Sequence, residues 1–251
     1  MKKRLILIGA YLFIIVISVL GLQHANAANE QASKEVLIKT VKKDVTGDRG
    51  RDKVSLMGIP YEDNSSFFKT IYLVVKEKNG KQEKVQLDGG YEPIMKFADF
   101  NRDKVKDVLV NVSTGGSGGT INSYVYSFAE GNAKNLSSPP SVSATAQFED
   151  DYKASIALAG QKPVMIDVRN RKKDYARLGL YSNGKLNEPT ELMVDLYSVM
   201  KIVRLPSGKG LKGIQRVSGA YRADALAEIT SVWFYENGEW RMVSASSKQI
   251  K

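Results

Sequence analysis

"DFNRDKVKDVLVNV", residues 99–112, joins a run of acidic and amide side chains to an apolar alternation. Side-chain oxygens stand at positions 1, 3, 5 and 9 of the run and a backbone carbonyl at position 7: Asp99, Asn101, Asp103, Asp107 and Val105. Calcium takes six to eight oxygen ligands, which a tight loop of this spacing can deliver. The alternating apolar residues that follow predict a strand. The stretch therefore predicts either a calcium loop or a metal-free turn held by Asp and Asn side chains, leading into β-structure.

A second stretch, "DVTGDRGRDKVSLMG" from residue 44, has the same layout 55 residues earlier. Its candidate ligands are Asp44, Thr46, Asp48, Gly50 (through its carbonyl) and Asp52. A spacing of this size is typical of repeated structural units. An EF-hand requires Glu at position 12, where Ser55 and Val110 stand here, so neither loop is an EF-hand.

These two stretches resemble the calcium loops of FG-GAP and VCBS-type repeats, which read Asp-x-(Asp/Asn/Thr)-x-Asp-Gly-x-x-Asp between strands. The resemblance covers residues 35–128 and is best in "FADFNRDKVKDVLVNVSTGGSGG". It implies propeller blades or propeller-like sheets in exported bacterial proteins, used for binding and adhesion. Carried over by position, the implied calcium ligands are the eight side chains of Asp44, Thr46, Asp48, Asp52, Asp99, Asn101, Asp103 and Asp107. One position departs from the pattern, because Arg49 and Lys104 replace the glycine at position 6. A left-handed conformation there costs a non-glycine residue about 1 kcal/mol, and a cation beside the site opposes calcium.

The rest of the chain reads as short strands and turns. Asn79-Gly80, Asn183-Gly184 and Asn237-Gly238 each separate β-branched or aromatic runs and predict type I′ hairpins. The run "DYKASIALAG" from Asp151 fits a short helix or a strand equally. We expect an all-β fold of propeller-like or sandwich-like antiparallel sheets.

Residues 130–146, rich in Ser, Pro and Asn, form the expected boundary inside the chain. It separates a β unit over residues 28–135, which holds both acidic loops, from a second unit over 146–251. Composition leaves open whether these are two domains or one continuous β structure.

A third, decayed copy of the loop is expected near residue 204, in "RLPSGKGLKGIQRV". Arg204, Pro206, Gly208 and Lys212 occupy its four ligand positions, so the register predicts a turn of similar shape without metal. The alternative is a coincidence, since glycine turns are common in β proteins.

The N-terminus predicts export. Three basic residues precede an uncharged run from Leu5 to Leu22, and Ala25-Asn26-Ala27 has the pattern that signal peptidase cleaves. Residues 1–27 are therefore expected to be a signal peptide, with an uncleaved membrane anchor as the alternative. The expected location is secreted or in the cell envelope, outside the cytoplasmic membrane.

Export would remove His24, the single histidine, and the chain has no cysteine. A mature chain of this kind excludes Ser-His-Asp triads, Cys-His pairs and ordinary zinc sites. The formal charge of +10 would fall to about +7, because three basic residues leave with the signal. Such a surface favours anionic neighbours outside the cell or is simply solvated, and we expect no nucleic-acid partner.

Two further stretches bear on ligand binding. "VRNRKKDYAR", residues 168–177, predicts either a solvated loop or an anion-binding patch of Arg169, Arg171, Lys172, Lys173 and Arg177. "STGGSGGT", residues 113–120, lacks the Gly-Lys-Ser/Thr ending of a phosphate loop and predicts a flexible connection between strands.

The combined expectation is an exported, calcium-associated, non-catalytic binding or structural protein of the bacterial envelope. Its expected partner is an anionic wall polymer, a glycan or an envelope protein, and a membrane only if the signal stays uncleaved. The alternative is a glycan hydrolase at the wall, which needs only two carboxylates. Available carboxylates are Glu149, Asp150, Asp151, Asp167 and Asp174, and nothing in the sequence fixes a pair.

Overall fold

The computed structural model describes residues 34–250, so the expected signal peptide lies outside the described part of the chain. Residues Glu35–Lys251 form one compact unit. The strands are β1 Val36–Lys43, β2 Asp52–Pro60, β3 Phe67–Lys76, β4 Gln82–Ala98, β5 Asp107–Ser113, β6 Ile121–Ser127, β7 Lys134–Asn135, β8 Ala144–Glu149, β9 Lys153–Leu158, β10 Val164–Asp167, β11 Tyr181–Ser182, β12 Lys185–Leu186, β13 Met193–Leu205, β14 Gly208–Ser218, β15 Ala225–Glu236 and β16 Glu239–Gln249. Short helical turns occur at η1 (Ala129–Gly131), η2 (Arg169–Arg171) and α2 (Lys172–Arg177). The prediction of an all-β fold is confirmed.

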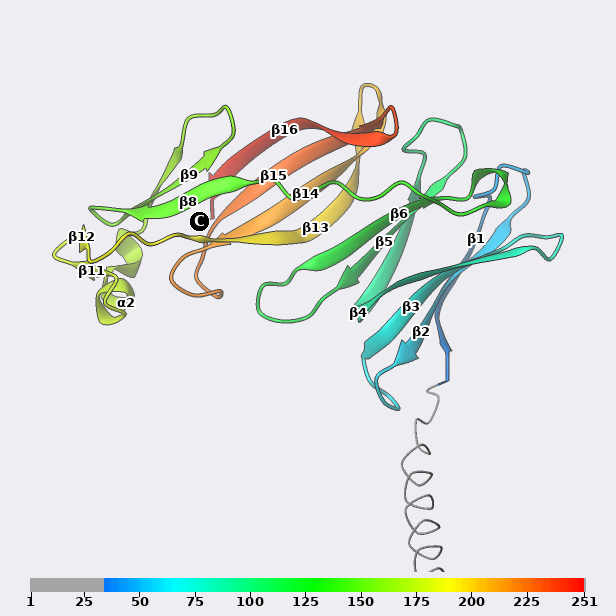
Figure 1. Cartoon of the computed structure of the whole chain (residues 1–251), viewed down its shortest axis with the longest axis horizontal. Coiled ribbons are helices and arrows are strands. Elements are labelled where there is room, and N and C mark those ends of the chain that lie inside the picture. The colour runs from blue at the N-terminus through cyan, green and yellow to red at the C-terminus, as the bar shows by residue number, and fades with distance from the viewer. Residues whose placement is uncertain (1–33, 251) are drawn as a thin grey trace, which may run out of the picture. The chain divides into compact units, whose positions relative to one another are not determined.

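The first sheet is an antiparallel meander in which β1 to β7 follow one another in chain order (Figure 1). β4 is long enough to pair with β3 through its first half and with β5 through its second. The two halves meet at Gly89 and Gly90, where a Cβ atom would come within 2.4 Å of the carbonyl oxygens of Phe68 and Ser113. Glycine is therefore needed at this bend, because the neighbouring backbones approach too closely for a side chain.

The bend lets the two halves of this sheet share a core. Val54, Leu56 and Ile71 from the β2–β3 half pack in one cluster with Val108 and Val110 from β5. All five side chains are fully buried. Along β3 the buried residues Ile71, Leu73 and Val75 alternate with half-buried ones, which is the two-residue period of a strand with one face in the core.

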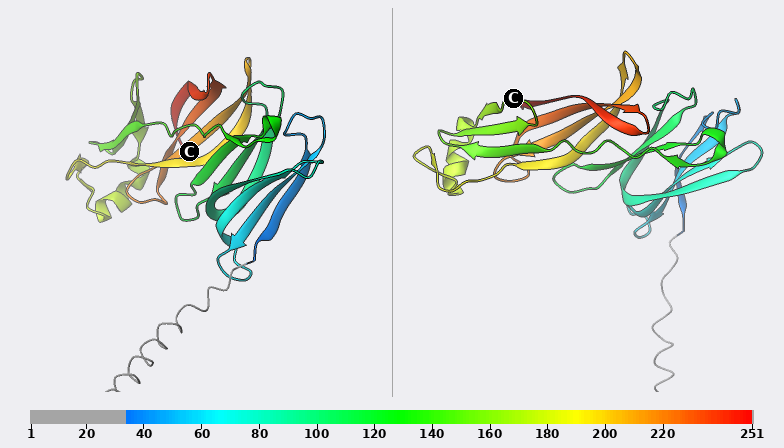
Figure 2. Two further views of the ribbon diagram at one scale, coloured as in Figure 1. Left: turned by 45° about the vertical axis from the view of Figure 1, so that its right-hand side comes forward. Right: turned by 45° about the horizontal axis from the view of Figure 1, so that its top comes forward.

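The C-terminal part contains three further antiparallel sheets, of which β11 and β12 form the smallest. A three-stranded sheet has the order β10-β9-β8, and a four-stranded sheet runs β13-β14-β15-β16. Figure 2 shows β8 and β9 beside the four-stranded sheet. Phe148 and Ile156 of the small sheet share a core cluster with Val217 and Ile229 of the larger one.

A third cluster joins the first sheet to the four-stranded sheet. Leu109 and Val125, on the opposite face of β5 and β6 from the first core, pack with Leu211, Trp233 and Trp240. The side chain of Asn111 on β5 also donates a hydrogen bond of 2.7 Å to the carbonyl of Met200 on β13. β5 is therefore buried on both faces, which explains its continuous apolar run.

Two of the three predicted Asn-Gly turns have the predicted form. Asn183 and Asn237 take positive φ values of 50° and 53°, and each following glycine is also positive. The prediction of a type I′ turn at Asn79-Gly80 is wrong. There the N–H of Gly80 bonds the carbonyl of Glu77, and only Gly80 has a positive φ. The longer loop closes as a type I turn followed by a left-handed glycine.

Two other expectations concern local conformation. The segment from Asp151, which fitted helix or strand, forms β9. The expected third loop near residue 204 is wrong in shape, because Leu205 pairs directly with Gly208 and leaves a tight turn at Pro206 and Ser207. Eight residues separate the strands at each acidic loop, so two residues cannot reproduce that conformation.

Candidate functional site

The two acidic stretches form connections at equivalent places in the first sheet. Residues 44–52, the first Asp loop, connect β1 to β2, and residues 99–107, the second Asp loop, connect β4 to β5. In each loop the aspartate at position 9 is the first residue of the following strand. The repeat seen in the sequence is therefore a repeat of strand, loop and strand.

The two loops also share their backbone conformation. Position 4 has a positive φ in both, 86° at Gly47 and 67° at Arg102. Position 6 has a positive φ at Arg49 (65°) and at Lys104 (71°). The resemblance to calcium loops implies glycine at position 6. Here the turn forms with Arg49 and Lys104 at that position. Each loop accepts about 1 kcal/mol of backbone strain at that residue.

Three hydrogen bonds recur at the same loop positions. In each bond an aspartate side chain accepts from a backbone N–H. The side chain at position 1 accepts from the N–H of position 4, the side chain at position 5 from the N–H of position 7, and the side chain at position 9 from the N–H of position 2. The first loop has Gly47 N to Asp44 Oδ1 (2.8 Å), Gly50 N to Asp48 Oδ1 (2.5 Å) and Val45 N to Asp52 Oδ2 (2.9 Å). The second has Arg102 N to Asp99 Oδ1 (2.7 Å), Val105 N to Asp103 Oδ1 (2.8 Å) and Phe100 N to Asp107 Oδ2 (2.7 Å). These bonds hold the loops as side-chain-stabilised turns.

The aspartate at position 9 is the unusual group in both loops. Asp52 and Asp107 are fully buried, and Oδ1 of each has no hydrogen-bond partner among the described residues. Burial raises the pKa of Asp107 to about 6, although the N–H of Phe100 and the nearby hydroxyl of Ser127 act to lower it. A buried carboxylate oxygen without a partner costs free energy, so its appearance at the same position in two loops calls for an explanation.

The remaining ligand candidates lie in the same loops. Thr46 is nearly buried and its hydroxyl donates to Asp52 Oδ2 at 3.1 Å, while the Asn101 side chain bonds Asp103 at 2.8 Å. Within residues 34–250, no three His, Cys, Asp or Glu side chains converge as a metal site would require. A cation here would also need the hydroxyl, the amide and the carbonyls of Gly50 and Val105, the oxygen ligands that calcium accepts.

The two loops touch each other and are anchored in the cores. Gly47 lies against Val105, since a Cβ at residue 47 would be 2.8 Å from Val105 Cγ2. The residues at position 2, Val45 and Phe100, are fully buried. The ring of Phe100 meets Trp240 edge-on at 5.5 Å between centroids. The shape of each Asp loop is thus coupled to the packing beneath it.

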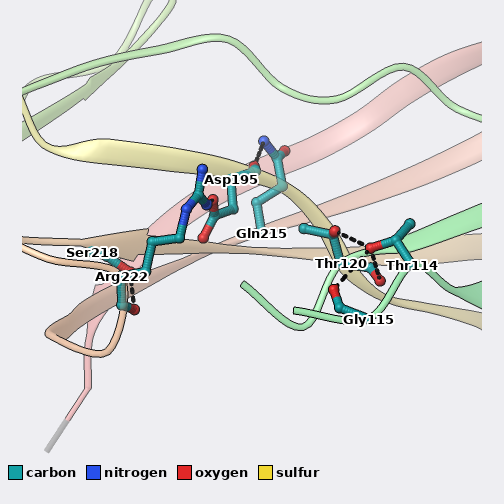
Figure 3. Close-up of polar contacts among 7 residues, drawn as sticks. All are labelled: Thr114, Gly115, Thr120, Asp195, Gln215, Ser218 and Arg222. Carbon is teal, nitrogen blue, oxygen red and sulfur yellow. Dashed lines mark hydrogen bonds and ion pairs between the residues drawn. The ribbon is translucent and has the colours of Figure 1, made fainter. Parts of the chain in front are cut away.

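The glycine-rich connection of residues 113–120 lies against Asp195 of β13 and Arg222 of the β14–β15 loop. Figure 3 shows Thr114, Gly115 and Thr120 of this connection and the Asp195–Arg222 pair. Its ends are tied by Thr114 and Thr120, whose hydroxyls are 2.7 Å apart. Gly118 is buried beside an ion pair between Asp195 and Arg222, and a Cβ at this position would lie 3.3 Å from Arg222 Nη1. The stretch opens no helix in the structure and joins β5 to β6, as expected for a connection between strands.

The predicted anion-binding residues lie around η2 and α2, and several have local partners. Arg169 pairs with Asp167, Arg177 lies 3.6 Å from Asp174, and Arg171 pairs with buried Asp224 at 2.5 Å. Lys172 lies over the ring of Tyr152, 5.4 Å from its centre. Lys173 is exposed. Much of the positive charge in this segment therefore faces an acid of the same chain.

Sequence reasoning missed a network at this segment and a second basic surface. Asp224, with a side chain only 1% exposed, receives a hydrogen bond of 2.5 Å from Tyr175 and one of 3.0 Å from the N–H of Ala220. The second surface lies across β1, β2 and β3, where lysines from separate strands become neighbours. Strand pairing creates it, because Lys42, Lys53 and Lys76 lie on three separate strands and no local pattern in the sequence connects them.

No described helix has the length and apolar character needed to cross a bilayer. The apolar run from Leu5 to Leu22 falls outside the described residues.

Comparisons with known proteins match the C-terminal part of the chain to a family model and most of the chain to one relative. Residues 142–248 match the family model described as the YybI C-terminal domain. The chain is 29% identical over 220 residues to the uncharacterized protein YybI of Bacillus subtilis (strain 168), covering 84% of each chain. No solved structure matches the chain significantly. The range matched by the family model begins just before β8 and ends in β16, so it spans the three- and four-stranded C-terminal sheets, the β11–β12 pair between them and their shared core.

Proposed function

We propose that this chain is an exported, non-catalytic binding or structural protein of the bacterial envelope, in which the two Asp loops bind calcium weakly. The observation that carries the calcium proposal is the buried, unpartnered Oδ1 of Asp52 and of Asp107. In each loop a bound cation would be the best partner for this oxygen, because burial penalises a carboxylate that has no partner. The location rests on the signal-like N-terminus and on a fold without cysteine.

Calcium would act indirectly. The ligand sets would be Asp44, Thr46, Asp48, Gly50 and Asp52 in the first loop, and Asp99, Asn101, Asp103, Val105 and Asp107 in the second. A bound cation supplies charge that offsets the carboxylates gathered in each loop. Because Val45 and Phe100 anchor the loops in two cores, fixing the loops would also stabilise the sheet beneath them. In this view the two strand–loop–strand units are a repeat of the FG-GAP and VCBS type.

Thermal melting with calcium tests the proposal. Each site with a Kd of about 10⁻⁴–10⁻³ M in about 10 mM calcium would add about 1.4–2.7 kcal/mol to the free energy of unfolding. For a chain of this size that stabilisation corresponds to a rise in Tm of about 3–10 °C for each occupied site. Magnesium at equal ionic strength serves as the salt control, since its small octahedral shell suits such loops poorly.

Isosteric variants of the two buried aspartates test whether the calcium-dependent rise in Tm comes from the Asp loops. Asp52→Asn and Asp107→Asn keep an oxygen for the N–H of position 2 but replace the unpartnered oxygen with an amide. Each should lose part of the calcium-dependent rise, and the double variant should lose all of it. Asp63→Asn, an exposed acid outside the loops, should keep the full rise. If the Tm of the wild type is the same with and without calcium, the calcium proposal is wrong.

A second candidate, a carboxylate-based glycan hydrolase, is favoured by one observation. A groove of about 570 Å³ is lined by Glu149, Asp150, Glu188 and Glu191. Lys185 holds the pKa of Asp150 below its usual range, chiefly through its hydrogen bond, whereas a general acid needs a raised value. Glu149 accepts hydrogen bonds from Gln147 and Ser155. New reducing ends after incubation with wall polysaccharide, lost in Glu149→Gln, would establish this activity.

A further inference from the structure

Three lysines form a row across the first three strands of the seven-stranded sheet. Lys42 on β1 is the register partner of Lys53 on β2, and Lys53 is in turn the register partner of Lys76 on β3. Directly opposed residues on adjacent strands have Cβ atoms about 4.5–5.5 Å apart and point to the same face. All three side chains are exposed. The row therefore places three positive charges side by side on one face of the sheet.

This face also carries a groove. A hollow of about 390 Å³ is lined by Lys53, Lys76 and Lys84, with Ser55 and Val74 below them. Ser55 and Val74 are register partners on β2 and β3, and Val74 is the partner of Lys84 on β4. Ser55 is only 5% exposed, although it lies on the outer face of the sheet. The lysine stems therefore lie over a floor formed by Ser55 and Val74, and lysines in such a position keep their ammonium groups in water.

Acidic neighbours compensate little of this charge. Glu35 is the one acid among the residues that line the groove, and it pairs with Lys84 at 2.8 Å. Lys84 is also 3.9 Å from the centre of the Tyr72 ring. Among residues 34–250, no acid lies within ion-pair distance of Lys42, Lys53 or Lys76. The row keeps its full charge toward solvent.

Fold stability does not account for the row. Like charges directly opposite each other across strands are destabilising. Lysine on an edge strand protects against unwanted pairing, which accounts for Lys42 on β1. It does not account for Lys53 and Lys76, since β2 and β3 lie inside the sheet and are paired on both sides.

We propose that the Lys42–Lys53–Lys76 row and its groove bind a linear polyanion that carries repeated phosphate groups. Strands lie about 4.8 Å apart, so the row presents its charges at intervals that flexible lysine stems can match to successive phosphates. Lysine binds phosphate as a mobile point charge and needs no fixed bidentate geometry. A groove between the lysines fits an extended chain better than a flat bilayer surface.

This inference deepens the proposed function by naming the class of partner, and it rests on that function only for an extracellular location. The lysine row lies on the outer face of β1–β3 and shares no residue with the Asp loops. Binding measured in excess EDTA is independent of calcium, and melting with calcium needs no polymer. The two proposals can therefore fail separately.

Titration with medium-chain sodium polyphosphate at low salt, in EDTA, tests the proposal. The variant Lys42→Gln/Lys53→Gln/Lys76→Gln should bind at least about tenfold more weakly and show a shallower dependence of affinity on salt. The matched control Arg169→Gln/Lys172→Gln/Lys173→Gln removes the same charge from the segment around η2 and α2 and should bind as the wild type does. Replacing the three row lysines by arginine keeps the charge and should retain binding.

Three results would overturn the proposal. Equal losses in the two glutamine variants would show that net charge alone attracts the polymer. Loss only in the control variant would move the site to residues 169–173. Vesicles containing phosphatidylglycerol that bind as tightly per phosphate as the polymer, with the same loss in the row variant, would identify a membrane surface as the partner. Unchanged melting temperatures in all variants would verify that each protein is folded.

Discussion

Gly47 of the first Asp loop packs against Val105 of the second, with room for no side chain between them: a Cβ at residue 47 would lie 2.8 Å from Val105 Cγ2. Two loops that are 55 residues apart in the sequence thus form one continuous surface at a single end of the sheet. A shift in the backbone of one loop would therefore change the packing of the other loop at this contact.

Replacing Gly47 tests the contact. Gly47→Ala should lower the free energy of unfolding by about 2–3 kcal/mol, because it adds a steric clash to the cost of a positive φ. Gly80→Ala is the matched control, since Gly80 has a similar φ of 93° and nothing within 4 Å. The control should lose only about 1 kcal/mol in urea unfolding. Equal losses would mean that the two loops do not depend on each other.

The hydrogen bond from Tyr175 to Asp224 should stabilise the fold. Tyr175→Phe removes a buried donor from a carboxylate and should cost about 1.5–3 kcal/mol. Tyr61→Phe, at a tyrosine that is 61% exposed, should cost almost nothing. Urea denaturation followed by circular dichroism measures both. A Tyr175→Phe variant as stable as the wild type would show that Arg171 and the N–H of Ala220 satisfy Asp224 by themselves.

The ion pairs of Arg222 and Arg169 should differ in strength. Arg222→Ala leaves the Asp195 side chain, 6% exposed, without its partner and should cost about 2–3 kcal/mol. Arg169→Ala breaks a pair whose side chains are 73% and 50% exposed and should cost about 0–1 kcal/mol. Thermal melts of the two variants provide the comparison. Similar small losses would indicate that water reaches Asp195 once the arginine is gone.

The core shared by the first sheet and the four-stranded sheet should make unfolding cooperative. Both tryptophans, Trp233 and Trp240, belong to this core, whereas circular dichroism reports on every sheet. The two signals should change together in urea. Leu109→Ala, a fully buried residue of β5, should shift both by about 2–5 kcal/mol. A fluorescence transition that stays in place would mean that the C-terminal sheets unfold as a separate domain.

Local patterns were sufficient for the features that depend on a few adjacent residues. The two-residue alternation predicts the all-β class, and Asn-Gly predicts the turns at residues 183 and 237. At residue 79 the same dipeptide takes another turn, because the strands end farther apart and the loop has more residues to place. The spacing of Asp44 and Asp52, repeated at Asp99 and Asp107, predicts two equivalent loops, since side-chain-to-backbone bonds act over short separations.

The sequence by itself determined the class of the fold, the two Asp loops and the basic character of the chain. Only the tertiary structure decided that the Asp loops touch, that one oxygen of Asp52 and of Asp107 is buried without a partner, and that Lys42, Lys53 and Lys76 stand in one row. The physical reason is the pairing of strands. Register between segments distant in the sequence sets which side chains become neighbours and which are removed from water, and a shift of one residue would send each of them to the opposite face.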